Sequence, residues 1–352
     1  MHNFFAGPGK LPASVLERIR TELTNFQGTG MSVMEISHRA PPILELIDHV
    51  EQRLRRLLRL PSESAVLMMQ GGGSLQFCLV PMNLSSPGDM VDYVETGYWA
   101  AKATNACRGM GRDVKVVARD YHAIPTNIEV RPEARYLHIC TNNTVVGTQW
   151  HSPPSVNIPI VADMSSDFLS RPQDISAFDL VYAHAQKTIG TAGVTVVILS
   201  EQALAKIPNG IPEFFDYRAH ARAKSNYHTP PVFSIYVMDC MLDWLEHEVG
   251  GLEAMGRLNQ EKAGLLYALL DASDLFRCPA SIASRSQMNL VFDIEDAKLA
   301  QQFSDRAREH GFVGLDGHRS RGGFRASLYN AVTLDDVSAL TSFMKDFERC
   351  QG

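Results

Sequence analysis

Two charged residues follow apolar runs in the middle of the chain, and their types suggest chemistry on a carbonyl compound. Lys187 lies between the apolar runs 180–183 and 194–199. Lysine is rarely buried without a task, and an amine with a depressed pKa can form an imine. Asp163 directly follows the apolar run 160–162, where a carboxylate could keep the pyridine nitrogen of pyridoxal phosphate protonated. Alone, a lysine such as Lys187 is more often solvated, and an aspartate such as Asp163 more often caps a helix or turn. Together, on successive expected strands, the two favour an imine with pyridoxal phosphate.

A glycine-rich turn offers a possible phosphate site. Three glycines at 71–73 precede Ser74, between an expected strand at 65–69 and an expected helix at 74–84. Glycine lets the backbone approach a phosphate closely, and a helix N-terminus supplies free N–H groups. A tight turn explains the glycines about as well, and no lysine follows them as in a P-loop. Trp99, after the next expected strand, could stack on a planar cofactor or simply pack in the core.

Basic side chains near both ends of the chain could bind anionic groups. Arg39 follows His38, and Arg319 follows His318, six residues before Arg325. The arginine fork matches carboxylates and phosphates in a bidentate manner. A solvated, glycine-rich loop accounts equally well for the arginines near the C-terminus.

The elements that would position these residues alternate between short apolar strands and helices. This order predicts an α/β fold with a mostly parallel sheet covered on both faces, and ligands in such sheets lie at the carboxyl ends of the strands. Helices are expected at 74–84 and 98–110. The expected strands are 65–69, 90–94, 114–118, 135–140, 158–162, 180–183 and 194–199.

The pattern changes after about residue 231, where long helical stretches predict a smaller α+β domain. Residues 232–249 and 252–269 read as helices, 288–292 and 324–329 as strands, and 297–310 as a further helix. A last helix is expected from Thr333, with Asp336 completing a capping box. We expect a large domain at 13–250 and a small domain formed by 1–12 and 251–352.

Composition excludes several other classes of protein. The 352 residues are 45% apolar and 20% charged, with a formal net charge of −6, which argues against a broad nucleic-acid-binding face. No run of 18 apolar residues and no signal peptide is recognisable, so no membrane span is expected and the cytoplasm is the expected location. The six cysteines contain no CxxC pair and fit no zinc pattern, so no metal site is expected.

Together these segments resemble the phosphoserine aminotransferases, which are class V, fold-type I transferases dependent on pyridoxal phosphate. The resemblance covers essentially the whole chain, in the family's order. It implies a large domain with a mostly parallel sheet, a smaller α+β C-terminal domain, and a homodimer with shared active sites. The motifs that carry it are residues 5–9, 34–39, 71–73, 97–100, 185–190, 229–231, 317–319 and 325–330.

The resemblance also implies a role for each site residue. Lys187 would carry the cofactor as an imine and move a proton, with Asp163 at the pyridine nitrogen. Trp99 would stack on the ring and Thr144 would bond the 3-hydroxyl. The cofactor phosphate would be held by Gly73, Ser74 and Gln186 and, from the neighbouring subunit, by His228 and Thr229. Arg325 would bind the substrate α-carboxylate. The distal anion would be bound by His38 and Arg39 of the neighbour together with His318 and Arg319.

The implied reaction is transamination between O-phospho-L-serine and 2-oxoglutarate, giving 3-phosphohydroxypyruvate and L-glutamate in serine biosynthesis. A role in vitamin B6 biosynthesis stays open. Two departures from the family's pattern bear on anion binding: Ser74 stands where some members have arginine, and His228 where many have asparagine. The alternatives are a class V aminotransferase of the serine–pyruvate type, which needs no second anion site, and a non-enzymatic phosphate-binding module.

Overall fold

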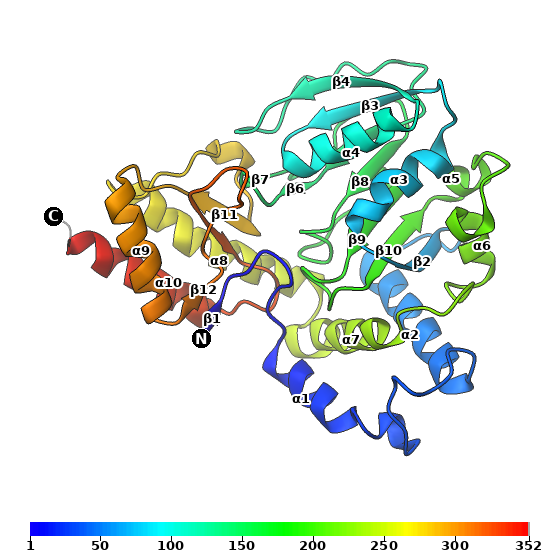
Figure 1. Cartoon of the computed structure of the whole chain (residues 1–352), viewed down its shortest axis with the longest axis horizontal. Helices are drawn as coiled ribbons and strands as arrows, with labels where there is room; N and C mark the ends of the chain where they lie inside the picture. The colour runs from blue at the N-terminus through cyan, green and yellow to red at the C-terminus, as the bar shows by residue number, and fades with distance from the viewer. Residues whose placement is uncertain (351–352) are drawn as a thin grey trace.

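Seven strands form one central sheet in a computed structural model that describes residues 1–350 (Figure 1). The order across the sheet is β2-β10-β9-β8-β5-β3-β4. In chain order the strands are β2 (Ala65–Gln70), β3 (Met90–Glu95), β4 (Asp113–Arg119), β5 (Leu137–Cys140), β8 (Ile160–Asp163), β9 (Leu180–His184) and β10 (Val194–Leu199).

Only β10 runs against its neighbours in this sheet. It pairs antiparallel with β2 and with β9, whereas the pairs β9–β8, β8–β5, β5–β3 and β3–β4 are parallel. Parallel strands need crossover connections. Helices supply those from β2 to β3 and from β3 to β4, whereas the connections from β5 to β8 and from β8 to β9 contain no α-helix. The carboxyl ends of β5, β8 and β9 therefore meet at one edge of the sheet, where Cys140, Asp163 and His184 are the last residues of their strands. The mostly parallel sheet expected from the sequence is confirmed.

Helices cover both faces of the sheet, so its strands are apolar on both sides. On one face lie α3 (Gly73–Leu84) and α4 (Tyr98–Gly109), packed against Leu67, Tyr93 and Tyr182. On the other lie α2 (Pro41–Leu58) and α7 (Val232–Asp243), packed against alternate residues such as Val181. Nine of the twelve residues of α7 are buried, as expected for a helix that is apolar on all sides.

A second body contains the C-terminal elements, at the left of Figure 1. Strands β11 (Asn289–Phe292) and β13 (Phe324–Ser327) pair antiparallel. They pack with α8 (Leu252–Ala272), α9 (Ala297–Glu309) and α10 (Leu334–Arg349) around a core rich in phenylalanine. The capping box predicted at the start of α10 is present, because Thr333 and Asp336 exchange hydrogen bonds with each other's backbone N–H groups.

The chain begins in this second body. Strand β1 (His2–Asn3) pairs in parallel with β12 (Phe312–Val313), and Phe4 lies in the phenylalanine-rich core. Helix α8 contributes to both cores, with Leu252 and Met255 in the large one and residues from Ala263 onward in the small one. The proposed division at residue 250 stays a prediction; within α8 the change from the large core to the small one lies between Met255 and Ala263.

Several element boundaries differ from the sequence-based ones. Strand β8 includes Asp163, and β5 and β13 are shorter than expected. Helix α7 ends at Asp243 and continues as a π-helical turn, Trp244–Val249, before Gly250 takes a left-handed conformation. Helices α1 (Ala13–Glu22) and α2 were not anticipated. The remaining short elements are β6 (Asn142–Asn143), β7 (Thr148–Gln149), α5 (Glu201–Ala205), α6 (Tyr217–Arg222) and 3-10 turns of three residues each.

Across residues 1–350, no helix is both long and apolar enough to cross a membrane. In the same range, no three potential metal-ligating side chains come together.

Candidate active site

A cavity of about 250 Å³ opens at the carboxyl ends of β5, β8 and β9. We call it the lysine cavity. Six of the residues predicted as cofactor ligands line it: Gly73, Ser74, Trp99, Asp163, Gln186 and Lys187. The other lining residues are Ala6, Gly7, Gly72, Phe77, Cys140, Asn142, Ser166 and His184.

The side chain of Lys187 is half-buried and lines this cavity. It follows β9, and the N-terminal segment of the chain packs against its loop, where the Gly9 N–H donates to the Gln186 carbonyl at 2.8 Å. A Cβ on Gly9 would come within 2.8 Å of the Lys187 carbonyl oxygen, so only glycine allows this close approach. Burial lowers the pKa of the Lys187 amine, and Asp163 opposes that effect. A lowered pKa leaves more of the amine neutral, which is the form that attacks a carbonyl.

Asp163 lies at the floor of the cavity and is 6% exposed. It ends β8, paired with Cys140 on one side and Tyr182 on the other. Its Oδ1 accepts a hydrogen bond from the Ser165 N–H at 2.9 Å. A carboxylate held rigidly between two strands can bind a protonated ring nitrogen without reorganising.

The start of α3 forms another wall of the cavity. Gly73 and Ser74 are its first two residues, and no side chain caps the helix. The first N–H groups of a helix have no intrahelical partner and lie at the positive end of its dipole. They are therefore suited to bind a phosphate, as the glycine-rich sequence predicts.

Trp99 connects the cavity to the predicted substrate residues. Its ring centroid lies 5.9 Å from the Lys187 Nζ, and its Nε1 donates to the Thr144 Oγ1 at 3.2 Å. Arg325, from β13, donates to the Thr144 carbonyl oxygen at 2.7 Å. The His318 ring lies 6.4 Å from the Trp99 ring. The chain thus gathers Trp99, Thr144, His318 and Arg325 beside the cavity, whereas Arg319 is exposed on the loop after His318.

The four residues expected to serve a neighbouring subunit do not line the lysine cavity of their own chain. They lie on two adjacent segments, because Asn226 donates to the His38 carbonyl oxygen at 3.0 Å. Arg39 and Thr229 follow on these segments, and Gln70 donates to the Thr229 carbonyl oxygen at 2.7 Å. His228 stacks on Phe214 with 4.7 Å between ring centroids.

Sequence reasoning missed His184, although it stands directly before Ala185-Gln186-Lys187. Its side chain lines the cavity on the α3 side. Asn142 and Ser166 were also missed; they are buried and hydrogen-bonded to each other at 2.8 Å. The available signal was a histidine directly after the apolar run 180–183.

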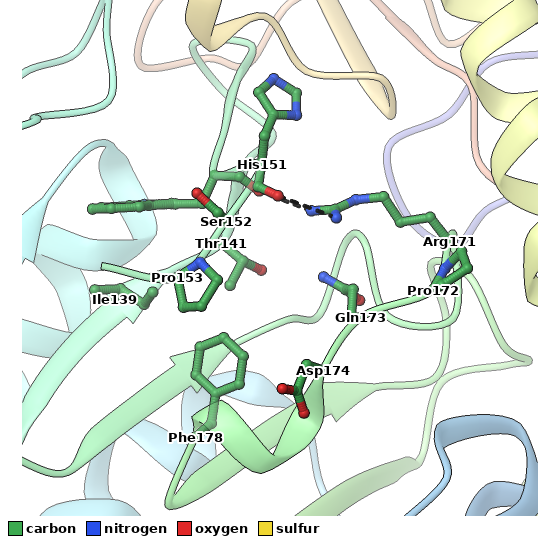
Figure 2. A pocket seen from close by; sticks show the side chains of 11 residues that line it. Ile139, Thr141, His151, Ser152, Pro153, Arg171, Pro172, Gln173, Asp174 and Phe178 are labelled. Carbon is green, nitrogen blue, oxygen red and sulfur yellow. Dashed lines mark hydrogen bonds between the residues drawn. The ribbon is translucent and has the colours of Figure 1, made fainter. Parts of the chain in front are cut away.

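A second, smaller pocket of about 170 Å³ lies on the other side of strand β5 (Figure 2). Ile139 and Thr141 line it, whereas Cys140 between them lines the lysine cavity, as the alternation of side chains along a strand requires. Arg171 closes this pocket by donating to the main-chain oxygens of Trp150 and His151, at 2.9 and 3.4 Å. None of the predicted site residues lines it.

Comparisons with known proteins identify the family of this chain. Residues 1–340 match the class-V aminotransferase family. The phosphoserine aminotransferase of Desulfosudis oleivorans is 46% identical over 100% of this chain and 99% of its own length. That of Geobacillus kaustophilus is 48% identical over 99% of this chain and 98% of its own.

This chain belongs to the class-V aminotransferases, in the phosphoserine aminotransferase family. Solved structures of the family have the same fold. The enzyme of Bacillus circulans subsp. alkalophilus is 42% identical, with a TM-score of 0.96, over 100% of this chain and 99% of its own. The pyridoxal-phosphate-bound enzyme of Trichomonas vaginalis is 36% identical, with a TM-score of 0.94, over 98% and 99% of the two chains.

The residues of the lysine cavity fit the family's cofactor. Free N–H groups at the start of α3 suit its phosphate, Asp163 suits its ring nitrogen, and Lys187 suits its aldehyde carbon. Gln186 keeps its buried Oε1 without a hydrogen-bond partner among residues 1–350. A buried polar atom without a partner is costly in a native structure and is expected where a polar ligand belongs.

Proposed function

We propose that the chain catalyses the reversible transamination of O-phospho-L-serine with 2-oxoglutarate, giving 3-phosphohydroxypyruvate and L-glutamate. The observation that carries this proposal is the pair of anion-binding sets beside one cavity. Arg325 is held at the edge of the cavity, and His318 with Arg319 lies on the preceding loop. Phosphoserine, glutamate and 2-oxoglutarate each carry a second anion besides the α-carboxylate, so each can use both sets.

Bound pyridoxal phosphate supplies an electron-accepting ring that stabilises negative charge at the substrate α-carbon. Lys187 would hold the cofactor, and its amine would move the proton at the substrate Cα. Asp163 would keep the ring nitrogen protonated, which maintains the ring as an electron acceptor. Trp99 would exclude water from the ring.

Arg325 orients the substrate through its α-carboxylate. The main-chain oxygen of Thr144 already holds one edge of the guanidinium, so little rotational freedom is lost when a carboxylate binds. Burial lowers the pKa of Arg325, yet a guanidinium stays charged at neutral pH. Desolvation strengthens its attraction for a carboxylate.

A neighbouring copy of the chain would complete two sets. Its His38 and Arg39 would join the second anion set, and its His228 and Thr229 would bind the cofactor phosphate. His38, Arg39, His228 and Thr229 lie outside their own lysine cavity, on adjacent segments of the surface. A two-fold dimer would exchange them reciprocally between the two sites. The homodimer, the cytoplasmic location and a role in vitamin B6 biosynthesis are parts of this proposal.

Donor preference tests the proposed substrate. The purified holoenzyme is assayed with phosphoserine, serine and alanine, with 2-oxoglutarate as acceptor. Losing several charged hydrogen bonds at about 1.5–3 kcal/mol each should lower kcat/KM for the neutral donors by at least ~10²-fold. Comparable values for alanine and phosphoserine would instead support an aminotransferase of the serine–pyruvate type. Absence of a near-visible cofactor band would support a non-enzymatic binding module.

A further inference from the structure

His184 stands where the strand that precedes Lys187 meets the start of α3. It is the last residue of β9, and Tyr182, two residues earlier, packs against Phe77 of α3. Because side chains alternate along a strand, His184 lies on the same face as Tyr182. This is the face covered by α3, whose N-terminal residues form a wall of the lysine cavity.

The His184 ring occupies the space next to Gly73, the first residue of that helix. A Cβ placed on Gly73 would come within 2.8 Å of the ring Cδ2 and 3.5 Å of the Nε2. Gly73 therefore tolerates no side chain, and the reason is the imidazole edge that carries Nε2. This edge adjoins the helix N–H groups that suit a phosphate.

The protonation of the ring follows from its surroundings. Burial, and then the nearby Lys187 amine, lower the pKa of His184 to about 3, so the imidazole is neutral at neutral pH. A neutral ring carries one N–H donor and one acceptor. The Nδ1 is buried and has no partner among residues 1–350. A phosphate at the Cδ2–Nε2 edge would select the tautomer with its proton on Nε2, because phosphate oxygens accept hydrogen bonds.

We propose that His184 is a further cofactor-binding residue, whose Nε2–H donates a hydrogen bond to the cofactor phosphate beside the Gly73 and Ser74 amides. This inference rests on the proposed function, because it assumes that pyridoxal phosphate occupies the lysine cavity. A phosphate so close to the ring supplies the acceptor that the Nε2–H otherwise lacks. The competing interpretation is that His184 only fills space beneath Gly73.

Three substitutions separate these interpretations. His184→Leu keeps an apolar side chain of similar bulk but removes the donor. His184→Gln places an amide N–H near the position of Nε2, whereas His184→Asn places one near Nδ1 and serves as the matched control. Each variant is freed of cofactor, and the dissociation constants of pyridoxal phosphate and of pyridoxal, which lacks the phosphate, are measured by absorbance titration.

A hydrogen bond to the phosphate predicts a loss that depends on the phosphate itself. His184→Leu and His184→Asn should bind pyridoxal phosphate ~10- to 100-fold more weakly and pyridoxal about as well as the unmodified chain. His184→Gln should recover most of the affinity. In the holoenzyme, the ³¹P resonance of the cofactor should move in the leucine variant and stay near its original position in the glutamine variant.

Equal losses for both ligands in His184→Leu, or no rescue by His184→Gln, would overturn the proposal in favour of a space-filling role. Unchanged affinity in His184→Leu would also overturn it. Failure of the unmodified chain to bind pyridoxal phosphate would reject the proposed function instead, so the two failures are distinguishable.

Discussion

Arg325 donates a hydrogen bond from its Nη1 to the main-chain oxygen of Thr144 at 2.7 Å. The two residues come from different bodies, since Arg325 belongs to β13 and Thr144 follows β6. The Thr144 hydroxyl in turn accepts from the Trp99 indole. One threonine therefore positions both the arginine and the aromatic ring, which in the proposed function would align a substrate carboxylate with the face of the cofactor.

Arg325 and Arg319 should have separable roles. Arg325→Ala should lower kcat/KM for every amino donor, because all of them share the α-carboxylate. Arg319→Ala should harm phosphoserine and glutamate by ~10-fold or more while sparing alanine. Steady-state kinetics with the three donors measure the split.

Arg321 offers the matched control for that comparison. It lies in the same glycine-rich segment, but its guanidinium is paired with Asp293 at 2.6 Å. Arg321→Ala should therefore leave the ratio of phosphoserine to alanine activity unchanged. Equal losses across all donors in both Arg319→Ala and Arg325→Ala would contradict the division of roles.

Lys187 should be the lysine that is covalently bound to the cofactor. Borohydride reduction of the holoenzyme should leave a phosphopyridoxyl mass on the peptide that contains Lys187. Lys262 is the internal comparison, because burial lowers its pKa to about 7, yet its ammonium donates to three main-chain oxygens, those of Leu328, Tyr329 and Val332. Peptide mass spectrometry that finds the label on Lys262, or on no lysine, rejects the assignment.

Asp336 should stabilise the fold in a pH-dependent way. Burial by itself raises the pKa of Asp336, but hydrogen bonds from Lys10, Thr333 and His2 outweigh burial and lower the pKa from 3.8 to about 2. A carboxyl whose folded pKa is depressed contributes stability above its unfolded pKa and loses it as the pH falls toward the folded value. The contribution should be complete above about pH 4 and decline between 3.8 and 2.

Urea unfolding of the Asp336→Asn variant measures this contribution. At pH 7 the variant should be less stable by ~1–3 kcal/mol, because the carboxylate also forms the capping box of α10. At pH 3 the difference from the unmodified chain should be smaller. A difference that is the same at pH 7, 5 and 3 would mean that the charge of Asp336 contributes nothing.

Much of the lysine cavity could be predicted because its residues follow short apolar runs. Asp163, Lys187 and the glycines at 71–73 each stand at a strand end, and strand ends of a parallel sheet converge in space. Helix α2 was also within reach of the sequence, since Ile43, Ile47 and Val50 belong to a stripe with helical spacing.

Other features depend on contacts that no local pattern carries. The role of His184 rests on its ring lying against Gly73, more than a hundred residues away. Helix α8 contributes residues to both cores. Its apolar stripe alone does not reveal where one core ends and the other begins. The single antiparallel strand β10 follows from sheet pairing, which strand composition leaves open.

A shared active site predicts that an inactive variant and a weakly active variant restore activity to each other. Lys187→Ala lacks the amine that forms the imine. Arg39→Ala lacks the guanidinium that would bind the distal anion in the site of the neighbouring subunit. The two purified variants are dissociated together and then reassociated, and phosphoserine transamination is measured against each variant treated alone. Native mass spectrometry counts the hybrid dimers.

The expected recovery follows from the geometry of a two-fold dimer. Each hybrid contains one site in which Lys187 comes from one chain and Arg39 from the other, both intact, while its second site lacks both. Random pairing makes half of the dimers hybrid, so activity should return to roughly a quarter of the unmodified level. If Arg39 instead served the cavity of its own chain, every hybrid site would carry one defect. Hybrids that form by mass but restore no activity would therefore reject the shared site.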